Sequence, residues 1–320
     1  MKLGVLTVVF GQQSLTEALD LAKAHGLEMV ELGTGNYPGD AHCNLEKLLK
    51  SAEARKRLLE DVGSRGLEIS GLACHGNALH PNKALARKFD DTAKKTIRLA
   101  SLLGVKTVID FSGCPGDGPN AKYPNWVTCP WPPDFLKILE WQWDDVVIPY
   151  WTRQAQFAKD HGVRIAIEMH PGFVVYSPET LMKLRKAVGE TVGANLDPSH
   201  LFWQGIDPVQ SVFYLGPAIH YVHAKDTRID PANTALCGVL DTKHYGDVRG
   251  RSWVFRSCGW GHGREFWTSF ASALRVVGYD HVLSIEHEDG LMSPLEGFVK
   301  AVEFLKPIVM HETPGEMWWA

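Results

Sequence analysis

Short runs of apolar residues alternate with longer amphipathic stretches along the whole chain. The apolar runs have the length of β-strands and are almost continuously hydrophobic, which is typical of parallel strands buried on both faces. We predict such strands at Lys2–Val8, Met29–Leu32, Glu68–Ala73, Thr107–Asp110, Val163–Glu168, Val192–Asp197, Ile219–Ala224 and His281–Glu286.

The stretches between these strands repeat their apolar residues with the period of an α-helix. Ser14 followed by Glu17 predicts an N-terminal capping box, and Gly104 after Leu103 predicts a left-handed C-terminal cap. We predict helices at Ser14–His25, Ala52–Ser64, Ala84–Leu103, Trp143–His161, Pro178–Val188, Pro208–Leu215, Gly263–Val277 and Pro294–Leu305.

This alternation predicts an α/β fold, a single (β/α)8 TIM barrel. A doubly wound sheet fits less well, because no glycine-rich phosphate loop follows the first strand. We assign residues 1–308 to the barrel and residues 309–320 to a C-terminal extension.

Two connections, Phe111–Phe135 after strand four and Thr227–His262 after strand seven, are longer than a barrel needs. Both follow the carboxyl ends of strands, where barrel enzymes build their active sites, and long connections often form lids. We expect Trp126, Trp131 and Trp260 to stack on a sugar ring or close over it. Surface decoration or a subunit contact is the alternative.

Acidic or histidine residues mark the ends of four consecutive predicted strands: Glu168, Asp197, His223 and Glu286. Three converging carboxylates would repel one another, and a divalent cation would resolve that conflict. Three oxygen donors and one imidazole suit Mn²⁺ first, with Mg²⁺ or Co²⁺ as alternatives, whereas structural zinc normally has thiolate ligands. The pattern therefore predicts a site for one divalent metal at the rim of the barrel.

Charge and cysteine usage narrow the classes of partner. The chain has 33 Lys+Arg and 37 Asp+Glu, a formal net charge of -4, which disfavours binding to nucleic acid or to an anionic membrane. Its six cysteines are scattered and form no C-x-x-C pair, and no signal-peptide pattern opens the chain. We expect a cytoplasmic protein with reduced thiols that acts on a small sugar, as a homo-oligomer or with a second subunit.

The segments Asn195–His200, Val222–Asp226 and Ser284–His287 resemble the xylose-isomerase-like barrel superfamily. The resemblance covers essentially the whole chain and lies in the sugar phosphate isomerase/epimerase branch, which includes D-tagatose 3-epimerase. It implies a metal-dependent isomerase or epimerase that acts on a small sugar or keto-sugar through an enediolate.

The same resemblance implies roles for individual residues. Glu168, Asp197, His223 and Glu286 match the four ligands of one metal ion, and Glu168 and Glu286 also match the groups that exchange the substrate proton. His200 matches a residue that hydrogen-bonds substrate, and Arg228 lies about where an epimerase has a substrate-contacting arginine.

One departure from the epimerase pattern suggests a different outcome. Epimerases usually follow the strand-five glutamate with proline, but here the run is Glu168-Met169-His170. This Glu-x-His arrangement resembles the metal-bearing subunit of enzymes that cleave 3-keto-glycosides, including C-glycoside deglycosidases. In such a β-eliminating lyase His170 would be the base, because a neutral imidazole suits that role near neutral pH. A residue that orients Glu168 is the alternative role for His170.

Two readings outside this chemistry stay open. The first is a non-catalytic sugar-binding barrel, which would have no need of carboxylates placed to bind a metal. The second is a nuclease of the endonuclease IV type, which would need more zinc ligands and a basic surface than this chain offers. His75 follows strand three at the same rim, where it contacts substrate or serves packing. We expect Lys225 and Asp226 to form a structural ion pair.

Overall fold

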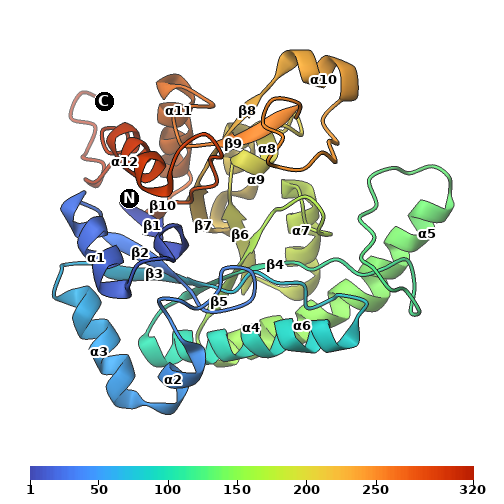
Figure 1. Ribbon diagram of the computed structural model, residues 1–320, viewed down its shortest axis with the longest axis horizontal. Helices are drawn as coiled ribbons and strands as arrows, with labels where there is room; N and C mark the ends of the chain where they lie inside the picture. The colour runs from blue at the N-terminus through green and yellow to red at the C-terminus, as the bar shows by residue number, and fades with distance from the viewer.

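The computed structural model, which describes all 320 residues, closes eight parallel strands into one barrel (Figure 1). The strands hydrogen-bond in the order β1-β10-β7-β6-β5-β4-β3-β2. The predicted TIM barrel is therefore confirmed, with most strand ends within two residues of their predicted positions. The barrel strands are β1 (Lys2–Leu6), β2 (Met29–Gly33), β3 (Glu68–Ala73), β4 (Thr107–Phe111), β5 (Arg164–Glu168), β6 (Val192–Leu196), β7 (Ile219–Ala224) and β10 (Val282–Ile285).

Helices surround the barrel and return the chain from each strand to the next. The predicted capping box of Ser14 with Glu17 is present, and Gly104 ends its helix with a positive φ of 74°. Residues 7–10 form a short 3-10 helix, so the last two residues of the predicted first strand, Thr7 and Val8, are helical instead. The surrounding helices are α1 (Leu15–Ala24), α2 (Leu45–Lys50), α3 (Ala52–Gly63), α4 (Lys83–Leu103), α7 (Pro178–Val188), α8 (Ser199–Phe202), α9 (Pro208–Leu215), α11 (Arg264–Val276) and α12 (Pro294–Leu305).

The first long connection has nearly its predicted bounds, but the helical run that follows it begins earlier than predicted. A continuous helical run extends from α5 (Asp134–Trp141) through a π-helical segment (Gln142–Val147) into α6 (Ile148–Asp160). The prediction had begun this helix at Trp143. Residues 112–133 remain irregular, and α5 projects from the barrel at the right of Figure 1.

The second long connection has structure of its own, which the sequence pattern did not predict. It contains an antiparallel hairpin of β8 (Asp226–Ile229) and β9 (Trp253–Arg256), with α10 (Pro231–Cys237) between the two strands. The hairpin and α10 lie together at the upper right of Figure 1. We call residues 226–262 the insertion.

Asp226 holds both ends of the insertion together. Its buried carboxylate accepts hydrogen bonds from the backbone N–H groups of Gly259 (3.1 Å), Gly261 (3.1 Å) and His262 (2.8 Å). The His262 side chain lies 2.8 Å away through Nδ1. The expected Lys225–Asp226 ion pair is absent, because this carboxylate binds backbone groups and the Lys225 ammonium contacts other carboxylates.

The interior of the barrel is filled by side chains at its amino-terminal end. Met29, Ile109, Ala166, Tyr221 and Val282 form a buried cluster there. These side chains leave no room at Gly71, where a Cβ would lie only 2.6 Å from the Ile109 side chain and 3.1 Å from the Tyr221 ring. The filled interior leaves the opposite end of the barrel for the polar residues.

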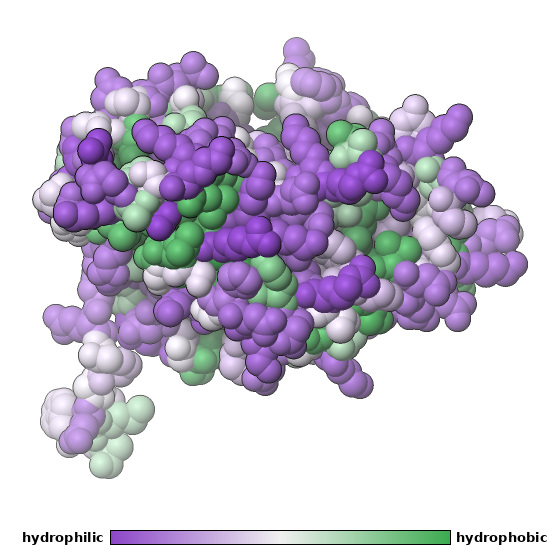
Figure 2. Space-filling model, turned by 90° about the horizontal axis from the view of Figure 1, so that it is seen from below, coloured by the Kyte–Doolittle hydropathy of each residue, from purple (hydrophilic) through white to green (hydrophobic).

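The outer surface is mainly polar. On the face seen from below in Figure 1, apolar residues stand in small groups between hydrophilic ones (Figure 2). Beyond α12, residues 311–320 are exposed, and the paired Trp318 and Trp319 pack against each other rather than against the barrel. None of the helices is both long and apolar enough to cross a membrane.

Candidate metal and active site

The four predicted metal ligands meet at the carboxyl end of the barrel. Glu168 ends β5, Asp197 follows β6, His223 lies in β7 and Glu286 follows β10. Because these strands are neighbours in the barrel, one ligand atom from each residue lies within 4.8 Å of the others. The cluster is almost entirely buried, and only the Glu286 side chain keeps 16 % exposure.

A buried lysine compensates part of the negative charge. Lys225 Nζ lies 3.1 Å from Asp197 Oδ2, 2.8 Å from Glu286 Oε2 and 3.1 Å from Glu288 Oε2. Burial alone would lower the pKa of Lys225, but these carboxylates hold it well above its usual value. The ammonium group therefore stays charged beside the cluster.

The charges push the pKa values of the carboxyl groups apart. Burial raises the pKa of Asp197 to about 7, with the Lys225 charge opposing the rise. Burial also acts on Glu168, but the charge of His75 and hydrogen bonds from the histidines hold its pKa well below the usual value. Such separation is expected where several carboxylates share one buried site.

His223 has a carboxylate behind it that the sequence analysis missed. Its Nε2 lies 3.0 Å from Glu31 Oε2, and Ser284 Oγ donates to the same oxygen at 2.7 Å. Metal-binding histidines usually donate their second N–H to such a carboxylate, which orients the ring. The available signal was Glu31 itself, a charged residue inside the apolar run of β2.

Three further side chains fix the Glu168 carboxylate. His75 Nε2 lies 2.9 Å from Oε2, the Asn195 amide donates to Oε2 at 3.0 Å, and His200 Nε2 lies 3.1 Å from Oε1. The structure therefore brings the predicted His75 and His200 to the cluster. It adds Asn195, which lies on β6 and was not singled out from the sequence.

The donor set fits a divalent cation. Asp197 Oδ2 is a buried carboxylate oxygen with no partner in hydrogen-bonding geometry, although the Lys225 ammonium lies 3.1 Å away. Carboxylate oxygens with one imidazole are ligands that Mn²⁺, Mg²⁺ and Co²⁺ accept, and zinc also binds such sets at catalytic sites. The residues therefore fit a metal ion held by Glu168, Asp197, His223 and Glu286.

His170 faces the site, and one of its two ring nitrogens is already hydrogen-bonded to the backbone. Its Nδ1 lies 2.6 Å from the Pro171 carbonyl oxygen, which only accepts, so Nδ1 carries the proton and Nε2 keeps a lone pair. Burial lowers the pKa of His170, with the Glu168 charge opposing it. Together with Glu168 and His200, His170 also forms a second group of donor atoms within 4.8 Å.

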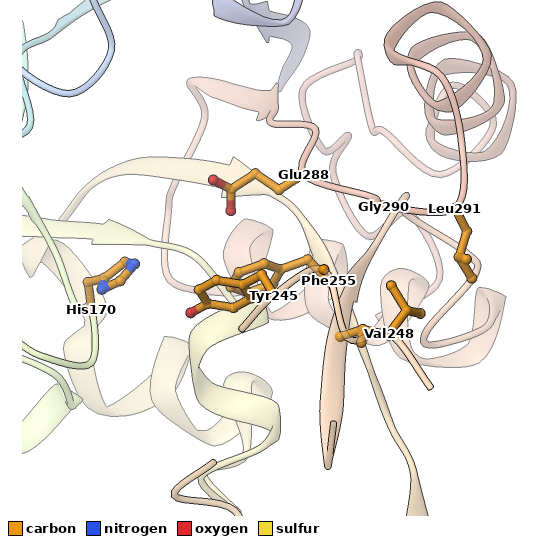
Figure 3. Close-up of a pocket in the computed structure, with 9 residues that line it drawn as sticks. His170, Tyr245, Val248, Phe255, Glu288, Gly290 and Leu291 are labelled. Atoms are coloured by element: carbon orange, nitrogen blue, oxygen red, sulfur yellow. The ribbon is translucent and has the colours of Figure 1, made fainter. Parts of the chain in front are cut away.

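Two cavities meet at this site. The polar cavity, of about 250 Å³, lies over the cluster and is lined by Leu6, Val8, Tyr37, Pro38, His75, Phe111, Glu168, His170, Lys225, Glu286 and Glu288. The apolar cavity, of about 450 Å³, is lined by His170, Tyr245, Gly246, Val248, Val254, Phe255, Glu288, Gly290 and Leu291 (Figure 3). His170 and Glu288 line both cavities, so the two cavities lie next to each other.

The remaining predicted substrate contacts lie outside both cavities. Trp126 packs against Tyr176 with ring centroids 5.5 Å apart, and Trp131 is largely exposed. Trp260 lies under the side chains of Arg256 and Lys300. Arg228 is exposed on β8 and lines neither cavity. Their contact with a sugar stays a prediction.

Comparison with known proteins places this geometry in a family. A family model described as xylose isomerase-like TIM barrel matches residues 19–308, most of the chain. The chain belongs to this xylose isomerase-like TIM barrel family. The resemblance inferred from the sequence motifs is thereby confirmed at the level of the family.

One relative and several solved structures are similar over nearly the full length. YfiH of Bacillus subtilis (strain 168), described as uncharacterized, is 42 % identical over 312 residues, which are 97 % of this chain and 99 % of YfiH. The probable 3-DHS dehydratase AsbF of Bacillus anthracis, involved in petrobactin synthesis, has a TM-score of 0.68 at 18 % identity and covers 96 % of this chain and 99 % of its own.

Two further structures show the same fold. The IolI protein with a bound zinc atom has a TM-score of 0.64 at 20 % identity and covers 97 % of this chain and 98 % of its own. A D-tagatose 3-epimerase-like protein has a TM-score of 0.63 at 21 % identity and covers 96 % of this chain and 98 % of its own. At these identities the likeness establishes the fold, and the chemistry has to be argued from the residues.

Proposed function

We propose that this protein is a divalent-metal-dependent isomerase or epimerase of a small sugar or keto-sugar. The observation that carries the proposal is the donor set of Glu168, Asp197, His223 and Glu286 on four adjacent strands beneath a polar cavity. A cavity of about 250 Å³ has room for a small polyhydroxylated molecule. The family assignment and the structural similarity to IolI, which binds a zinc atom, support a metal-dependent enzyme of this class.

The side chains supply what a proton exchange next to a carbonyl requires. A bound divalent cation, with Mn²⁺ as our first choice, would act as a Lewis acid that makes a neighbouring C–H more acidic. Glu286 is the more accessible carboxylate, with 16 % of its side chain exposed against 2 % for Glu168. Glu286 is therefore better placed to take the proton from carbon, and Lys225 at 2.8 Å balances its charge.

A second candidate is β-elimination from a 3-keto-glycoside, which His170 favours. Its Nε2 has a lone pair and its ring lines both cavities, so it can reach a substrate that spans them. In this step the C2 proton moves to His170 Nε2, the C1–C2 bond becomes double, and the group on C1 leaves with its bonding electrons. The likeness to a probable dehydratase supports elimination as a chemistry available to this fold.

Solvent-isotope exchange tests both candidates. The protein is stripped with a chelator, reloaded with Mn²⁺ and incubated in D₂O with free ketoses and with 3-keto-glucosides. Deuterium in an isomerised or epimerised sugar supports the proposal, and release of the aglycone supports elimination. Exchange that persists in the stripped protein would overturn metal dependence. Sugar binding without exchange or release in the loaded protein would instead support a non-catalytic sugar-binding barrel.

A further inference from the structure

The apolar cavity is built mainly by the insertion, together with His170 and with the loop after β10 that also carries Glu286. Val254 and Phe255 come from β9, and Tyr245 and Val248 come from the segment between α10 and β9. Leu291 comes from the loop between β10 and α12. The cavity is thus a feature of the insertion and the loop that faces it.

Tyr245 presents a fixed aromatic ring to this cavity. It stacks on Phe255 with ring centroids 5.7 Å apart and an interplanar angle of 20°, and the Arg251 guanidinium lies 4.4 Å from its ring centroid. Arg251 is itself buried, so these contacts hold the ring in place. Tyr245 nevertheless remains 55 % exposed, and Figure 3 shows it with Phe255 between His170 on one side and Val248 and Leu291 on the other.

The apolar cavity has unfilled volume next to Gly290. A Cβ placed on Gly290 would have one neighbour within 4 Å, Val248 Cγ2 at 3.6 Å, which is an ordinary van der Waals contact. Its φ lies outside the left-handed region, so a larger residue meets no backbone strain there. A longer side chain at position 290 would therefore extend into unfilled volume.

His170 and Glu288 connect this cavity to the cluster. Both line the polar cavity as well, and Glu288 Oε2 contacts the Lys225 ammonium at 3.1 Å. A molecule whose polar part lies over the cluster would therefore have the apolar cavity next to it, beside these two side chains. Burial of a flat ring against Tyr245, Phe255 and Leu291 is favourable because it removes apolar surface from water and adds aromatic stacking.

We infer that the apolar cavity is a subsite for a flat, apolar substituent, such as an aryl group, attached to the sugar that occupies the polar cavity. The inference rests on the proposed function only in placing a sugar over the cluster. It names a substrate class beyond small free sugars: glycosides or sugar derivatives with an aromatic group.

Binding of two matched probes tests the subsite. Phenyl β-D-glucopyranoside and methyl β-D-glucopyranoside share the sugar and differ in the substituent, so the ratio of their dissociation constants isolates the apolar cavity. We expect the Mn²⁺-loaded protein to bind the phenyl glycoside about tenfold more tightly in an NMR titration, as stacking and burial of one ring would give. Equal affinities, or no binding of either probe, would overturn the subsite.

Variants of the cavity residues test whether the preference for the phenyl glycoside arises in the apolar cavity. Tyr245→Ala removes the stacking ring and Gly290→Leu fills the cavity, so each is expected to bring the two dissociation constants within about twofold of each other. Tyr214→Ala, which removes an exposed tyrosine from α9, is the matched control and is expected to keep the tenfold ratio. A ratio unchanged in both cavity variants would place the aryl group elsewhere.

The result separates the subsite from the proposed reaction. A phenyl preference that depends on Tyr245, found in a protein that exchanges no deuterium, would support the subsite while the isomerase proposal fails. Deuterium exchange in a protein with no phenyl preference would overturn the subsite and leave the reaction standing.

Discussion

The two cavities of this barrel lie against each other and are built in opposite ways. The polar cavity takes its walls mainly from the ends of barrel strands and the loops just after them, and buried charged side chains such as Glu168 and Lys225 line it. The apolar cavity takes its walls mainly from the insertion and the loop after β10, and aromatic and aliphatic side chains line most of it. On the function and the subsite proposed above, the barrel would determine the reaction, whereas the insertion would determine which molecule is accepted.

The difference follows from how each region is held. Neighbouring barrel strands are joined by parallel hydrogen bonds, regular between β5 and β6 and with one register shift at Ala194/Asn195 between β6 and β7, so residues at their ends have little freedom. The insertion is tied at its two ends by one carboxylate, Asp226, and by stacked rings such as Trp203 and Trp253, whose centroids lie 4.6 Å apart. Four predictions test this division of roles, beginning with the largest expected effect.

The Asp197→Asn variant should lose metal binding and activity together. The substitution removes one anionic ligand, so we expect metal affinity to fall by at least about 100-fold and turnover to reach background. Calorimetric titration with Mn²⁺ measures the first effect and deuterium exchange the second. Glu288→Gln is the control: it contacts the same Lys225 but is outside the donor set, and it should bind the metal within a few-fold of the natural protein. Equal affinities in both variants would remove Asp197 from the site.

The His170→Ala variant should lose turnover in the elimination reaction and keep its metal. Loss of a general base costs about 10²–10⁴ in rate. His170→Gln retains a polar side chain without an imidazole and should be equally slow. Elemental analysis gives the number of metal ions per chain in each protein. A fall from two ions to one in both variants would make His170 a ligand of a second ion, as its closeness to Glu168 and His200 permits.

The Asp226→Asn variant should loosen the insertion before it affects the metal site. The neutral amide accepts the backbone N–H groups of Gly259, Gly261 and His262 less well, at a cost of about 3 kcal/mol. We expect faster amide hydrogen exchange over residues 238–262 and a weaker phenyl preference, with Mn²⁺ affinity almost unchanged. Asp230→Asn, at the exposed cap of α10 in the same insertion, should change these quantities little. Parallel loss of metal affinity would show that the two cavities are not independent.

Protonation of His220, near the amino-terminal end of the barrel, should lower the stability of the protein without affecting either cavity. Burial lowers the pKa of His220 to about 4, and the neighbouring Arg164 charge adds to the shift. Because the folded protein resists protonation of this ring, its stabilising contribution is complete above pH 6.5 and is lost as the pH falls from about 6.5 towards 4. We expect about 1 kcal/mol lower unfolding free energy at pH 5.5 than at pH 7.5 from this group.

Urea unfolding at the two pH values measures this effect. His220→Gln, which cannot titrate, should show a shallower pH dependence of the unfolding free energy, by about 1 kcal/mol between the two pH values. An unchanged pH dependence would mean that the buried imidazole does not control this part of the stability curve.

The hydrophobic pattern was sufficient for the barrel because its strands are buried on both faces and its helices on one. The strand Glu68–Ala73 and the helices Pro178–Val188 and Pro294–Leu305 have their predicted bounds. The hairpin of β8 and β9 was missed because its two strands pair across an intervening helix, so no short turn signal joins them. Its short strands are also stabilised by Asp226 and by the stacked rings of Trp203 and Trp253 rather than by their own pattern.

The candidate site was predictable only in part, because strand order groups some of its residues and long-range packing places the others. Strand order brings successive strand ends together, so Glu168 and Asp197 could be grouped from their positions alone. Lys225 follows His223 at the same rim, and its ammonium contacts Asp197 and Glu286. It does not pair with its sequence neighbour Asp226, because that carboxylate binds backbone N–H groups at the far end of the insertion, a contact that depends on how the insertion folds.

What the sequence determined by itself is the barrel and the gathering of acidic and histidine residues at one end of it, because local periodicity and strand order carry that information. Only the tertiary structure decided which groups support those residues and which walls surround them. Glu31 reaches His223 from across the barrel, and Tyr245 reaches the site from the insertion. Such contacts join residues far apart in the chain, and their geometry depends on packing that no local pattern encodes.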